Sequence, residues 1–325
     1  MNAANANLLN LRSLLAGNYD NIYIFTHLRP DGDAIGSSLA LANALKTGCK
    51  TVEVFCPDVI PSRYSFLPGV DNFQVSFTAR EGKSLAFILD CSDLRRLNNM
   101  GEKVLQLDRV VNIDHHITNE KFGDVNLIDA SAASTGEIIY QILKDDYELN
   151  YDISLCLYVA ISSDTGSFKY ENTTPQTMEI AARLLEKGIN PFYVSQKIFD
   201  EYPASTIFLL RDALGSLRFD ETGKIAWMVV DDAMLKKHGA ESSDLDGFIN
   251  YVKNIESVEV GIFFYQTDKG ETKVGFRSKT VDIASVAYSL GGGGHPRAAG
   301  CSLRGEPQEV IAKVVQSVAQ LFCKG

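Results

Sequence analysis

Short apolar runs alternate with stretches of helical periodicity along the first part of the chain. An apolar run bounded by turn residues predicts a buried strand, and apolar residues spaced three or four apart predict an amphipathic helix. The predicted strands cover residues 21–25, 51–56, 85–90 and 110–113, and the predicted helices cover residues 6–17, 38–46, 138–144, 155–162 and 177–187. This alternation is typical of an α/β domain with a mainly parallel sheet flanked by helices.

The pattern changes after residue 187. Residues 188–205 are predicted to form a helical linker. Beyond it, strands are predicted at residues 225–230, 258–266, 273–277 and 300–303, and helices at residues 244–253, 283–290 and 308–322. These elements show no clear parallel repeat, so we expect a smaller α+β domain. The expected division is residues 1–187, 188–205 and 206–325, with the active site in the cleft between the two domains.

The composition limits the classes of function. The chain has 325 residues, of which 45% are hydrophobic and 22% charged, as is ordinary for a globular protein. Its formal net charge of −10 argues against a protein that holds long nucleic acid through many phosphate contacts. A small phosphorylated substrate, held by a few cations and metal ions, remains compatible with this charge.

Cysteine usage and hydropathy favour the cytoplasm. The six cysteines are scattered and form no CxxC pair, so neither a zinc ribbon nor a redox dithiol is indicated. Free thiols fit a reducing compartment. No apolar run approaches the length of a membrane span, and the N-terminal residues do not have the pattern of a signal peptide. We therefore expect a cytoplasmic protein without a membrane partner.

Carboxylates and histidines stand at the ends of four apolar segments of the first domain. These residues are His27, Asp31 and Asp33, then Asp90, then Asp114, His115 and His116, and finally Asp164. Because the carboxyl ends of parallel strands lie at one edge of a sheet, we expect these side chains to converge. Two local alternatives remain: the histidine pair could cap its strand, and one aspartate of the first loop could cap the following helix.

The number of candidate ligands exceeds what one metal ion needs. Two metal ions bridged by a carboxylate fit better, and this is a standard arrangement for phosphoester hydrolysis. Ligands that are mostly oxygen, with some imidazole and no thiolate, favour Mn²⁺ or Mg²⁺ over structural zinc. The pattern therefore predicts a metal-dependent hydrolase of phosphoesters.

Two further motifs have structural alternatives. Ser134 and Glu137 fit a capping box that opens a helix, and we interpret both as structural. Residues 291–294 are four consecutive glycines before His295 and Arg297. Glycines free the backbone for close approach to a ligand, and their amides can bind an anion. The alternative is a flexible loop between a helix and a strand.

Together, these motifs resemble the DHH phosphoesterase superfamily. The resemblance rests on HxxxDxD from His27 to Asp33, the strand-end Asp90, the Asp-His-His triplet and the later Asp164. The stretch GGGGHPRAAG resembles the DHH-associated substrate-binding domain. The two-domain layout is most similar to the branch of nanoRNases, which are oligoribonucleases, and pAp phosphatases.

The resemblance implies a role for each motif residue. It implies a first metal ion on His27, Asp31 and Asp90, and a second on Asp33, Asp90, His115 and Asp164. Asp114 would orient the metal-binding loop, and His116 would approach the scissile phosphate or the leaving group. The expected ions are two Mn²⁺, with Mg²⁺ or Co²⁺ as options.

The resemblance also implies a substrate-binding surface on the second domain. The residues concerned are Arg277, Ser278, Gly292, Gly293, Gly294 and His295. Arg277 and Ser278 would bind the phosphate or the base of the substrate. His295 and the glycine amides would hold the substrate from this side, with His295 among the catalytic groups.

Relatives that share the first domain differ in their C-terminal portions. Family II pyrophosphatases carry an Arg-Lys-Lys signature, for which the nearest stretch here is Phe276-Arg277-Ser278-Lys279. Long single-strand exonucleases add an oligonucleotide-binding domain, and membrane-anchored cyclic-dinucleotide phosphodiesterases add transmembrane segments. Neither addition has room in this chain.

The favoured hypothesis is an Mn²⁺-dependent phosphoesterase with small substrates. It would release nucleoside 5′-monophosphates from very short oligoribonucleotides and the 3′-phosphate from 3′-phosphoadenosine 5′-phosphate (pAp). Alternatives are a phosphodiesterase acting on pApA or cyclic dinucleotides, and a non-catalytic nucleotide sensor. The sequence leaves the oligomeric state open, with a homodimer among the options.

Overall fold

The computed structural model describes residues 14, 17–46 and 51–322 of the chain. The helix predicted over residues 6–17 lies almost entirely outside them. The chain divides into two compact units, Met1–Glu201 and Tyr202–Gly325, each with a sheet of its own. None of the described helices combines the length and the apolar composition that a bilayer crossing requires.

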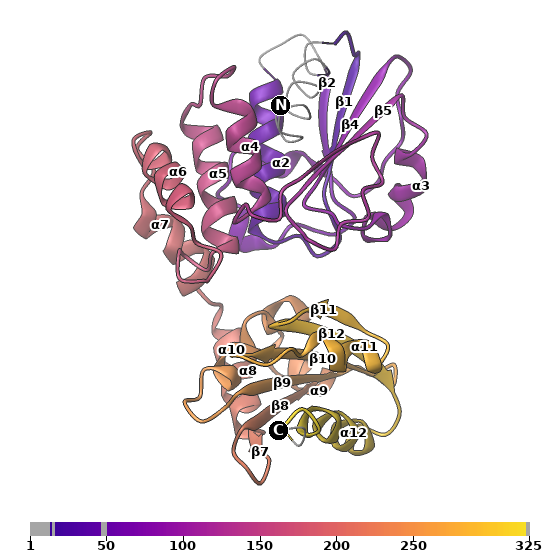
Figure 1. Ribbon diagram of the computed structural model, residues 1–325, viewed down its shortest axis with the longest axis vertical. Helices are drawn as coiled ribbons and strands as arrows, with labels where there is room; N and C mark the ends of the chain where they lie inside the picture. The colour runs from indigo at the N-terminus through magenta and orange to yellow at the C-terminus, as the bar shows by residue number, and fades with distance from the viewer. Residues whose placement is uncertain (1–13, 15–16, 47–50, 323–325) are drawn as a thin grey trace. The chain divides into compact units, whose positions relative to one another are not determined.

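A six-stranded parallel sheet forms the centre of the first unit (Figure 1). Its strands, in chain order, are β1 (Asn21–Phe25), β2 (Thr51–Phe55), β3 (Phe73–Gln74), β4 (Ser84–Leu89), β5 (Arg109–Asp114) and β6 (Val125–Ile128). Their spatial order is β3-β2-β1-β4-β5-β6. The four predicted strands are confirmed, whereas β3 and β6 were missed because each is too short for a periodic signal.

Alternating side chains of the central strand enter two different cores. Ile22 and Ile24 pack under α2 (Gly32–Leu45), α4 (Thr135–Leu143) and α5 (Tyr151–Asp164) on one face of the sheet. Tyr23 and Phe25 point to the opposite face, where they meet Phe55 and Phe77. Figure 1 shows α3 (Gly101–Val104) on that second face. Both faces are therefore covered, as a parallel sheet requires.

Helix α2 begins earlier than the predicted start at residue 38. Asp31 is its N-cap, and the Asp31 carboxylate accepts hydrogen bonds from the backbone N–H groups of Asp33 and Ala34, at 3.1 and 3.0 Å. Asp33 therefore lies in the first turn of α2 and not in the loop, which corrects the sequence prediction. The expected start rested on the apolar pattern alone, but capping by Asp31 satisfies the first free amides and starts the helix there.

Two glycines let three helices of the first unit approach closely. A Cβ atom on Gly36 of α2 would lie 2.4 Å from the carbonyl oxygen of Cys156 in α5. A Cβ atom on Gly136 of α4 would lie 2.5 Å from Cβ of Ala160, also in α5. Neither position has room for a side chain. The N-terminal parts of α2 and α4 are thereby held against the central part of α5.

Short helical segments complete the first unit and fill most of the predicted linker. They include α6 (Pro175–Leu185), α7 (Pro191–Ser195) and a π-helical turn at Gln196–Asp200. Val194 and Ile198 from these segments are buried in the core beneath α2, α4 and α5. Residues 191–200 therefore pack as part of the first unit, and α8 (Ala204–Gly215) opens the second.

The second unit has a mixed six-stranded sheet. Its strands are β7 (Arg218–Phe219), β8 (Ile225–Asp231), β9 (Val260–Gln266), β10 (Glu271–Ser278), β11 (Gly293–His295) and β12 (Ala298–Arg304). The spatial order is β11-β12-β10-β9-β8-β7, and only β8 and β9 run parallel to each other. The predicted α+β class and its four strands are confirmed, and β7 and β11 are additional.

Helices cover both faces of this second sheet. Helices α11 (Ala284–Ser289) and α12 (Pro307–Ala319) pack on one face, against Val274 and Phe276 of β10. Helices α8, α9 (Asp232–His238) and α10 (Phe248–Lys253) pack on the other, where Phe248 and Ile249 are buried. The side chains of β10 that face α10 are therefore those at the alternate positions, including residue 277.

The glycine run is part of a hairpin and not a free loop. Gly293 and Gly294 belong to β11, which pairs with β12 in antiparallel fashion. A Cβ atom on Gly292 would lie 2.1 Å from the carbonyl oxygen of Gly300, and Gly294 has a φ of +142°. Close backbone approach and a left-handed conformation explain Gly292 and Gly294. The pairing with β12 excludes the flexible loop, whereas ligand binding by these amides stays a prediction.

Replacing Gly36 with alanine tests the close helix contact. We expect Gly36→Ala to lower the free energy of unfolding by about 1–3 kcal/mol, because its methyl group has to push α2 away from α5. Urea unfolding followed by circular dichroism measures the change. Gly215→Ala is the matched control, because nothing lies within 4 Å of a Cβ atom there. Equal stability of the two variants would contradict the described packing.

Candidate active site

The candidate ligands gather where the strand order of the first sheet reverses. His27 follows β1, Asp90 follows β4 directly, and Asp114 ends β5. Strands β2 and β3 lie on one side of β1, and strands β4, β5 and β6 lie on its other side. The order in which the chain adds strands therefore reverses between β1 and β4. Open α/β sheets bind ligands at such a position, beyond the carboxyl ends of the strands. The predicted convergence of these segments is therefore confirmed by the fold.

One group of candidate ligands comprises His27, Asp31 and Asp90. Each offers a ligand atom, and these atoms lie within 4.8 Å of one another. Nε2 of His27 is 3.4 Å from Oδ2 of Asp90, and both side chains are buried. Nδ1 of His27 lies 2.8 Å from the carbonyl oxygen of Leu28 and 2.8 Å from Nη2 of Arg96. The imidazole is thus held from behind with Nε2 toward the carboxylates.

A second group comprises Asp33, His115 and Asp164, again within 4.8 Å of one another. Nε2 of His115 lies 3.1 Å from Oδ2 of Asp164 and 3.9 Å from Oδ2 of Asp33. It also lies 3.7 Å from Oδ1 of Asp90. The two groups therefore adjoin through Asp90, which is near both.

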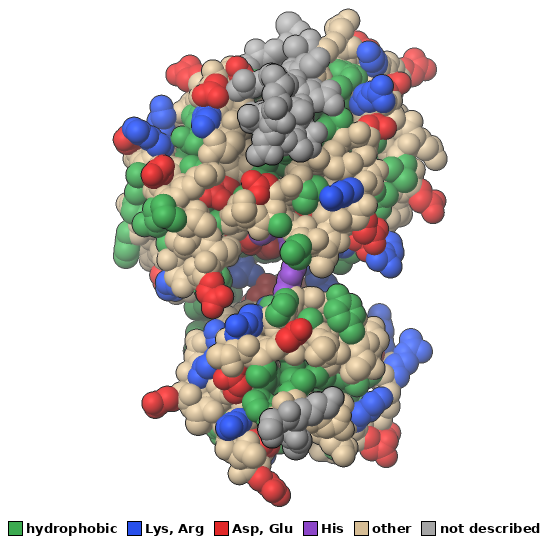
Figure 2. Space-filling view, in the orientation of Figure 1, with side chains coloured by type: hydrophobic (Ala, Val, Ile, Leu, Met, Phe, Trp, Pro, Cys, Tyr) green, Lys and Arg blue, Asp and Glu red, His purple; other side chains and the backbone are tan. Residues whose placement is uncertain are grey.

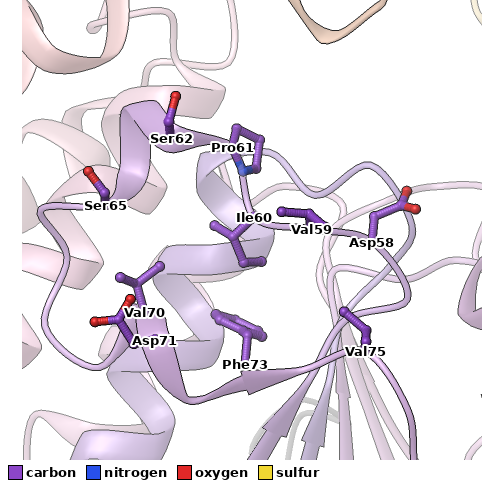
Figure 3. A pocket seen from close by; sticks show the side chains of 10 residues that line it. All are labelled: Asp58, Val59, Ile60, Pro61, Ser62, Ser65, Val70, Asp71, Phe73 and Val75. Atoms are coloured by element: carbon purple, nitrogen blue, oxygen red, sulfur yellow. The ribbon is translucent and has the colours of Figure 1, made fainter. Parts of the chain in front are cut away.

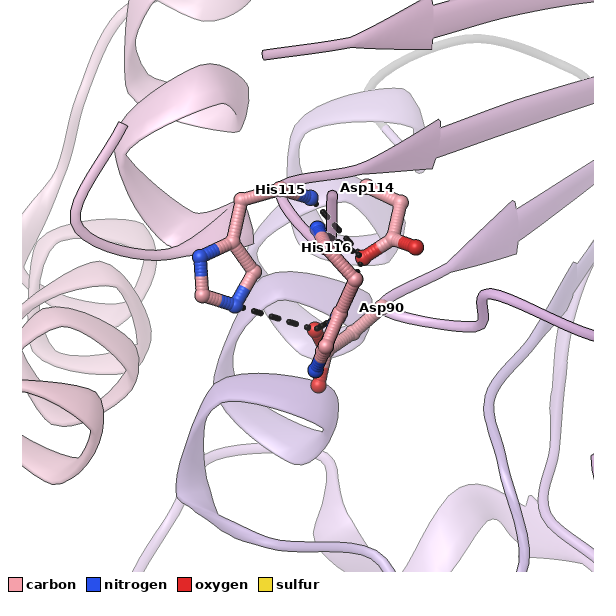
Figure 4. Close-up of side chains that lie close together, drawn as sticks. All are labelled: Asp90, Asp114, His115 and His116. Atoms are coloured by element: carbon pink, nitrogen blue, oxygen red, sulfur yellow. Dashed lines mark hydrogen bonds and ion pairs between the residues drawn. The ribbon is translucent and has the colours of Figure 1, made fainter. Parts of the chain in front are cut away.

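Asp114 braces the histidine pair that follows it. Its Oδ1 atom accepts from the backbone N–H groups of His115 and His116, at 2.8 and 3.2 Å, and lies 2.7 Å from Nδ1 of His116. Asn119 donates to its other oxygen at 2.6 Å. Figure 4 shows the rings of His115 and His116 turned toward Asp90. Asp114 is thus fully engaged in shaping the loop, and Nε2 of His116 points away from it.

The N-terminus of α4 holds two of the carboxylates, a feature the sequence analysis missed. The backbone N–H groups of Thr135 and Gly136 donate to the two oxygens of Asp33, at 2.6 and 2.8 Å. The Thr135 hydroxyl donates to Oδ1 of Asp90 at 3.1 Å. Ser134 caps this helix as predicted, while the Glu137 side chain bonds to the N–H of Ala133. The capping motif could have predicted this contact, because it marks the start of a helix, where free backbone N–H groups can bind a carboxylate.

The backbone at Asp90 is strained and is held by residues to which no role had been given. Asp90 has a φ of +54°, which is costly for a residue with a side chain. Its N–H donates to the carbonyl of Ile113 at 3.0 Å. The Asn112 amide donates to the carbonyls of Ile88 and Cys91, on both sides of this turn. These bonds aim the Asp90 carboxylate at both ligand groups.

The carboxylates of the cluster repel one another, and this raises the pKa values of several groups in it. Burial and the charges of Asp90 and Asp164 raise the pKa of Asp33 well above its ordinary value. Surrounding protein atoms and the same two charges raise the pKa of Asp31 to about 6, although its side chain keeps contact with solvent. Burial alone would lower the pKa of His115, but Asp164, Asp33 and Asp90 raise it to about 10.

The donor set fits hard divalent cations. Buried carboxylates that repel one another are stable only with a proton or a cation among them, and the raised pKa values of His27, His115 and His116 reflect this requirement. Cys91, the nearest thiol in sequence, is buried with a pKa raised to about 12 and its Sγ atom contacts the carbonyl of Asp93. Oxygen and imidazole donors without thiolate suit ions of the Mg²⁺ and Mn²⁺ type.

Two of the predicted residues of the second unit, Arg277 and His295, lie in a row across its sheet. Arg277 and His295 are both cross-strand partners of Ala298, on β10, β11 and β12 respectively. Directly opposed residues in an antiparallel sheet project to the same face, so the three share one face. Ser278 is buried, and its hydroxyl donates to the carbonyl of Val281.

A separate cavity of about 250 Å³ lies beside the first ligand loop (Figure 3). It is formed by the connection from β2 to β3, including Ile60, Phe73 and Val75, and contains none of the candidate ligands. Asp58 at its rim accepts a hydrogen bond from the N–H of Arg29, at 2.6 Å. The cavity is mostly apolar and has no metal-binding character.

Comparison with known proteins identifies the family. Residues 21–161 match the DHH family, N-terminal domain, and residues 222–324 match the DHHA1 domain. The chain therefore belongs to the DHH family, and it is an enzyme of the phosphoesterase class.

Individual relatives extend the similarity over nearly the whole chain. The chain is 32% identical over 302 residues to the bifunctional oligoribonuclease and PAP phosphatase NrnA of Thermus thermophilus, covering 92% of this chain and 89% of that protein. It is 28% identical over 289 residues to the protein of the same name from Bacillus subtilis, covering 88% and 90%. A solved exopolyphosphatase-related protein from Bacteroides fragilis has a TM-score of 0.90 at 25% identity, covering 97% and 96%.

Metal removal should make the stability of the protein depend on pH. The pKa values of Asp31 and Asp33 are raised in the folded state, so the folded state retains protons that the unfolded state has lost. The stability that these two groups contribute to the metal-free protein is therefore fully present below their ordinary pKa of 3.8, and it is lost as the pH rises through their raised values, which is about 6 for Asp31.

Thermal unfolding with EDTA and with Mn²⁺, at pH 5, 6 and 7.5, measures this effect. We expect Mn²⁺ to raise the melting temperature most at pH 7.5, because protons compete for the same carboxylates at pH 5. Asp31→Asn is the control and should flatten the pH dependence. Equal metal stabilisation at all three pH values would show that these carboxylates do not hold the ion.

The Thr135 hydroxyl should support metal binding through Asp90. We expect Thr135→Val to weaken Mn²⁺ binding about 10- to 100-fold, as is usual when a hydrogen bond to a metal ligand is lost. Thr135→Ser keeps the hydroxyl and should bind Mn²⁺ nearly as the unchanged protein does. Titration calorimetry measures both. Valine and serine variants with the same affinity would contradict the role of this bond.

Proposed function

We propose that this protein hydrolyses very short oligoribonucleotides to nucleoside 5′-monophosphates and removes the 3′-phosphate from pAp. One observation carries the proposal: two carboxylate and histidine groups adjoin at Asp90, in a chain similar over 92% of its length to a protein named for these two activities. A site that accommodates two divalent ions is suited to displacement at phosphorus.

We assign the ligands as two metal sites that share Asp90. His27, Asp31 and Asp90 form the first, and Asp33, Asp90, His115 and Asp164 form the second. The contact groups around His27 and around His115 support this assignment. When bound, two divalent ions supply the Lewis acidity that activates a water and balances charge on the phosphoryl oxygens. Mn²⁺ is our first choice, with Mg²⁺ or Co²⁺ as options.

In this proposal Asp114 orients the site, and His116 donates a proton to the leaving group. Asp114 fixes the backbone and ring of His116 through two contacts and also accepts from the N–H of His115, so that Nδ1 of His116 lies toward Asp114 and Nε2 on the far side of the ring. Burial alone would lower the pKa of His116, but Asp114 and Asp90 raise it, which favours the protonated ring. Such a ring can donate a proton to the leaving oxygen.

The second domain supplies the substrate contacts in this proposal. Arg277 and His295 share one face of the sheet and lie two strands apart, roughly 10 Å from backbone to backbone. Arginine is suited to phosphate through its fork of donors. The hairpin glycines Gly292, Gly293 and Gly294 would complete this surface, with His295 close to the reacting groups. Ser278 projects to the opposite face and is buried, so it would act only by holding the end of β10 through its bond to the carbonyl of Val281.

The proposed substrates are short, and no long nucleic acid is expected as a partner. On the face seen in Figure 2, the described Lys and Arg side chains are interspersed with Asp and Glu and form no continuous basic track. With a formal net charge of −10, extended phosphate binding is disfavoured. We further propose a cytoplasmic location, and a homodimer as the assembly to test first.

A panel of substrates tests the proposal. A short oligoribonucleotide, pAp, pApA, pyrophosphate and a short polyphosphate are incubated with the protein and Mn²⁺, and products are separated by chromatography. We expect mononucleotide from the oligonucleotides and AMP from pAp. Asp90→Asn should reduce both activities more than about 100-fold, because it removes a shared ligand. Asparagine tolerates the positive φ at this position, so folding is preserved.

Asp93→Asn is the matched control for the loss of a nearby negative charge. Asp93 caps the helical segment after β4 and pairs with Arg95, outside the ligand groups. This variant should retain activity. Hydrolysis of pyrophosphate or polyphosphate without nucleotide hydrolysis would refute the proposed substrates. Nucleotide binding without any hydrolysis would instead support a sensor.

A further inference from the structure

Two of the three ligands in the second candidate group are held by residues 132–136, the segment that opens α4. The Asp33 carboxylate accepts from two backbone N–H groups of this segment, and Nδ1 of His115 lies 3.4 Å from the carbonyl oxygen of Ala132. The third ligand, Asp164, comes from a different element, since it is the last residue of α5. Its position therefore depends on how the end of α5 is joined to this segment.

Asn172 makes that connection through its side-chain amide. Its Nδ2 atom donates to the carbonyl oxygen of Ala133 at 2.9 Å and to the carbonyl oxygen of Asp164 at 3.1 Å. A side-chain amide has two N–H donors, so both are used, one for each segment. Oδ1 of Asn172 is buried and finds no hydrogen-bond partner among the described residues. The fold therefore uses this side chain for its donors.

The end of α5 needs such a bond. The last four carbonyl groups of a helix lack donors from within the helix, and the carbonyl of Asp164 is one of them. The chain then passes through Gly166, Ser167 and Phe168, whose φ values are +56°, +60° and +64°. Left-handed backbone is costly for the two residues with side chains, and this cost favours rearrangement of the turn. The bond from Asn172 opposes that rearrangement at Asp164.

Burial alone does not fix the Asp164 carboxylate. Its side chain is 25% exposed, whereas the side chains of Asp33 and Asp90 are 0% and 2% exposed. Packing therefore restrains Asp164 least of these three carboxylates. Its contact with Nε2 of His115 is a contact with another ligand and not with the scaffold. The backbone at Asp164 has to be held if its carboxylate is to stay within the group.

We propose that Asn172 is a positioning residue of the second metal site. It holds Asp164 against the start of α4, so that binding of the second ion depends on Asn172 and binding of the first ion does not. This inference rests on the ligand assignment made for the proposed function. The two bonds of Asn172 go to Ala133 and Asp164 and reach no ligand of the first group.

Titration of the Asn172→Leu variant with Mn²⁺ tests the proposal. Leucine has nearly the shape of asparagine but no donor. We expect the second ion to bind about 10- to 100-fold more weakly, as when a hydrogen bond that orients a ligand is lost, and the first ion to bind as before. Calorimetry measures both affinities.

Electron paramagnetic resonance adds a spectroscopic signature. Two Mn²⁺ ions that share a carboxylate are magnetically coupled, whereas an isolated ion shows its own resolved hyperfine lines. With two ions added per chain, the unchanged protein should give the coupled spectrum and Asn172→Leu the spectrum of isolated ions.

Asn150→Leu is the matched control, because it removes an asparagine bond from the other end of the same helix. Asn150 caps α5 at its N-terminus, where its Oδ1 atom accepts from the N–H of Ile153 at 3.0 Å. That end lies about 20 Å from Asp164 along the helix axis. Asn150→Leu should therefore lower the stability of the fold and leave both Mn²⁺ affinities unchanged.

Circular dichroism verifies the folding of each variant. Asn172→Ala also removes the donors, with a smaller side chain, and takes the place of Asn172→Leu if the protein does not accommodate leucine. The expected result is the same.

The outcomes separate this role from the proposed function, because metal binding is measured without substrate. A selective loss of the second ion would support the role of Asn172 even if no substrate of the panel is hydrolysed. Unchanged binding of the second ion, equal weakening of both ions, or the same loss in Asn150→Leu would overturn it even in an active enzyme. An unchanged protein that binds a single ion would refute the second metal site and this role together.

Discussion

The repulsion among buried carboxylates at the end of β4 is the constraint on which the first domain depends. Asp33 and Asp90 are both almost fully buried and lie near Asp164, so their charges disfavour one another. The fold compensates with the amides of Thr135 and Gly136, with the Thr135 hydroxyl and with three histidines. These groups hold the oxygens apart at positions suited to cations, and the same arrangement would be unstable without a proton or a metal ion.

Helix packing makes this concentration of charge geometrically feasible. The helices α2, α4 and α5 each contribute one terminus to the site, and side chains on them would normally keep the termini apart. Gly36 and Gly136 remove that separation by allowing backbone contact with α5. The close contacts lie within three turns of the ligands, so the packing and the chemistry are parts of one unit. A small change in helix distance would shift Asp33 and Asp164 together.

The second domain uses a sheet surface in place of helix termini. Arg277 and His295, two of its proposed substrate residues, lie in a cross-strand row, where register sets the spacing at about 5 Å per strand. Gly261 lies opposite Arg277 and has no side chain, which lets Lys253 at the end of α10 approach the sheet. The first domain therefore concentrates negative charge for cations, and the second, in the proposed function, presents positive charge for anions. These two kinds of charged surface suit a phosphoesterase that uses metal ions and takes a small anionic substrate.

The sequence by itself determined the α/β and α+β classes, the main strands and the residue types that gather at the strand ends. Apolar runs ending in Asp90 or Asp114 identify both the strand and the chemistry, because a charged residue cannot continue a buried strand. The start of α2 was predicted too late, since the apolar pattern alone does not show that the helix is capped at Asp31.

Only the tertiary structure decided which groups meet across long stretches of chain. Thr135 bonds to Asp33 although 102 residues separate them, and Lys253 covers Gly261 although the two lie on different elements. Neither contact produces a periodic pattern in the sequence, because both contacts depend on the distances between crossing helices and on strand register. These quantities arise from packing of whole elements, and no short segment carries the energy that fixes them.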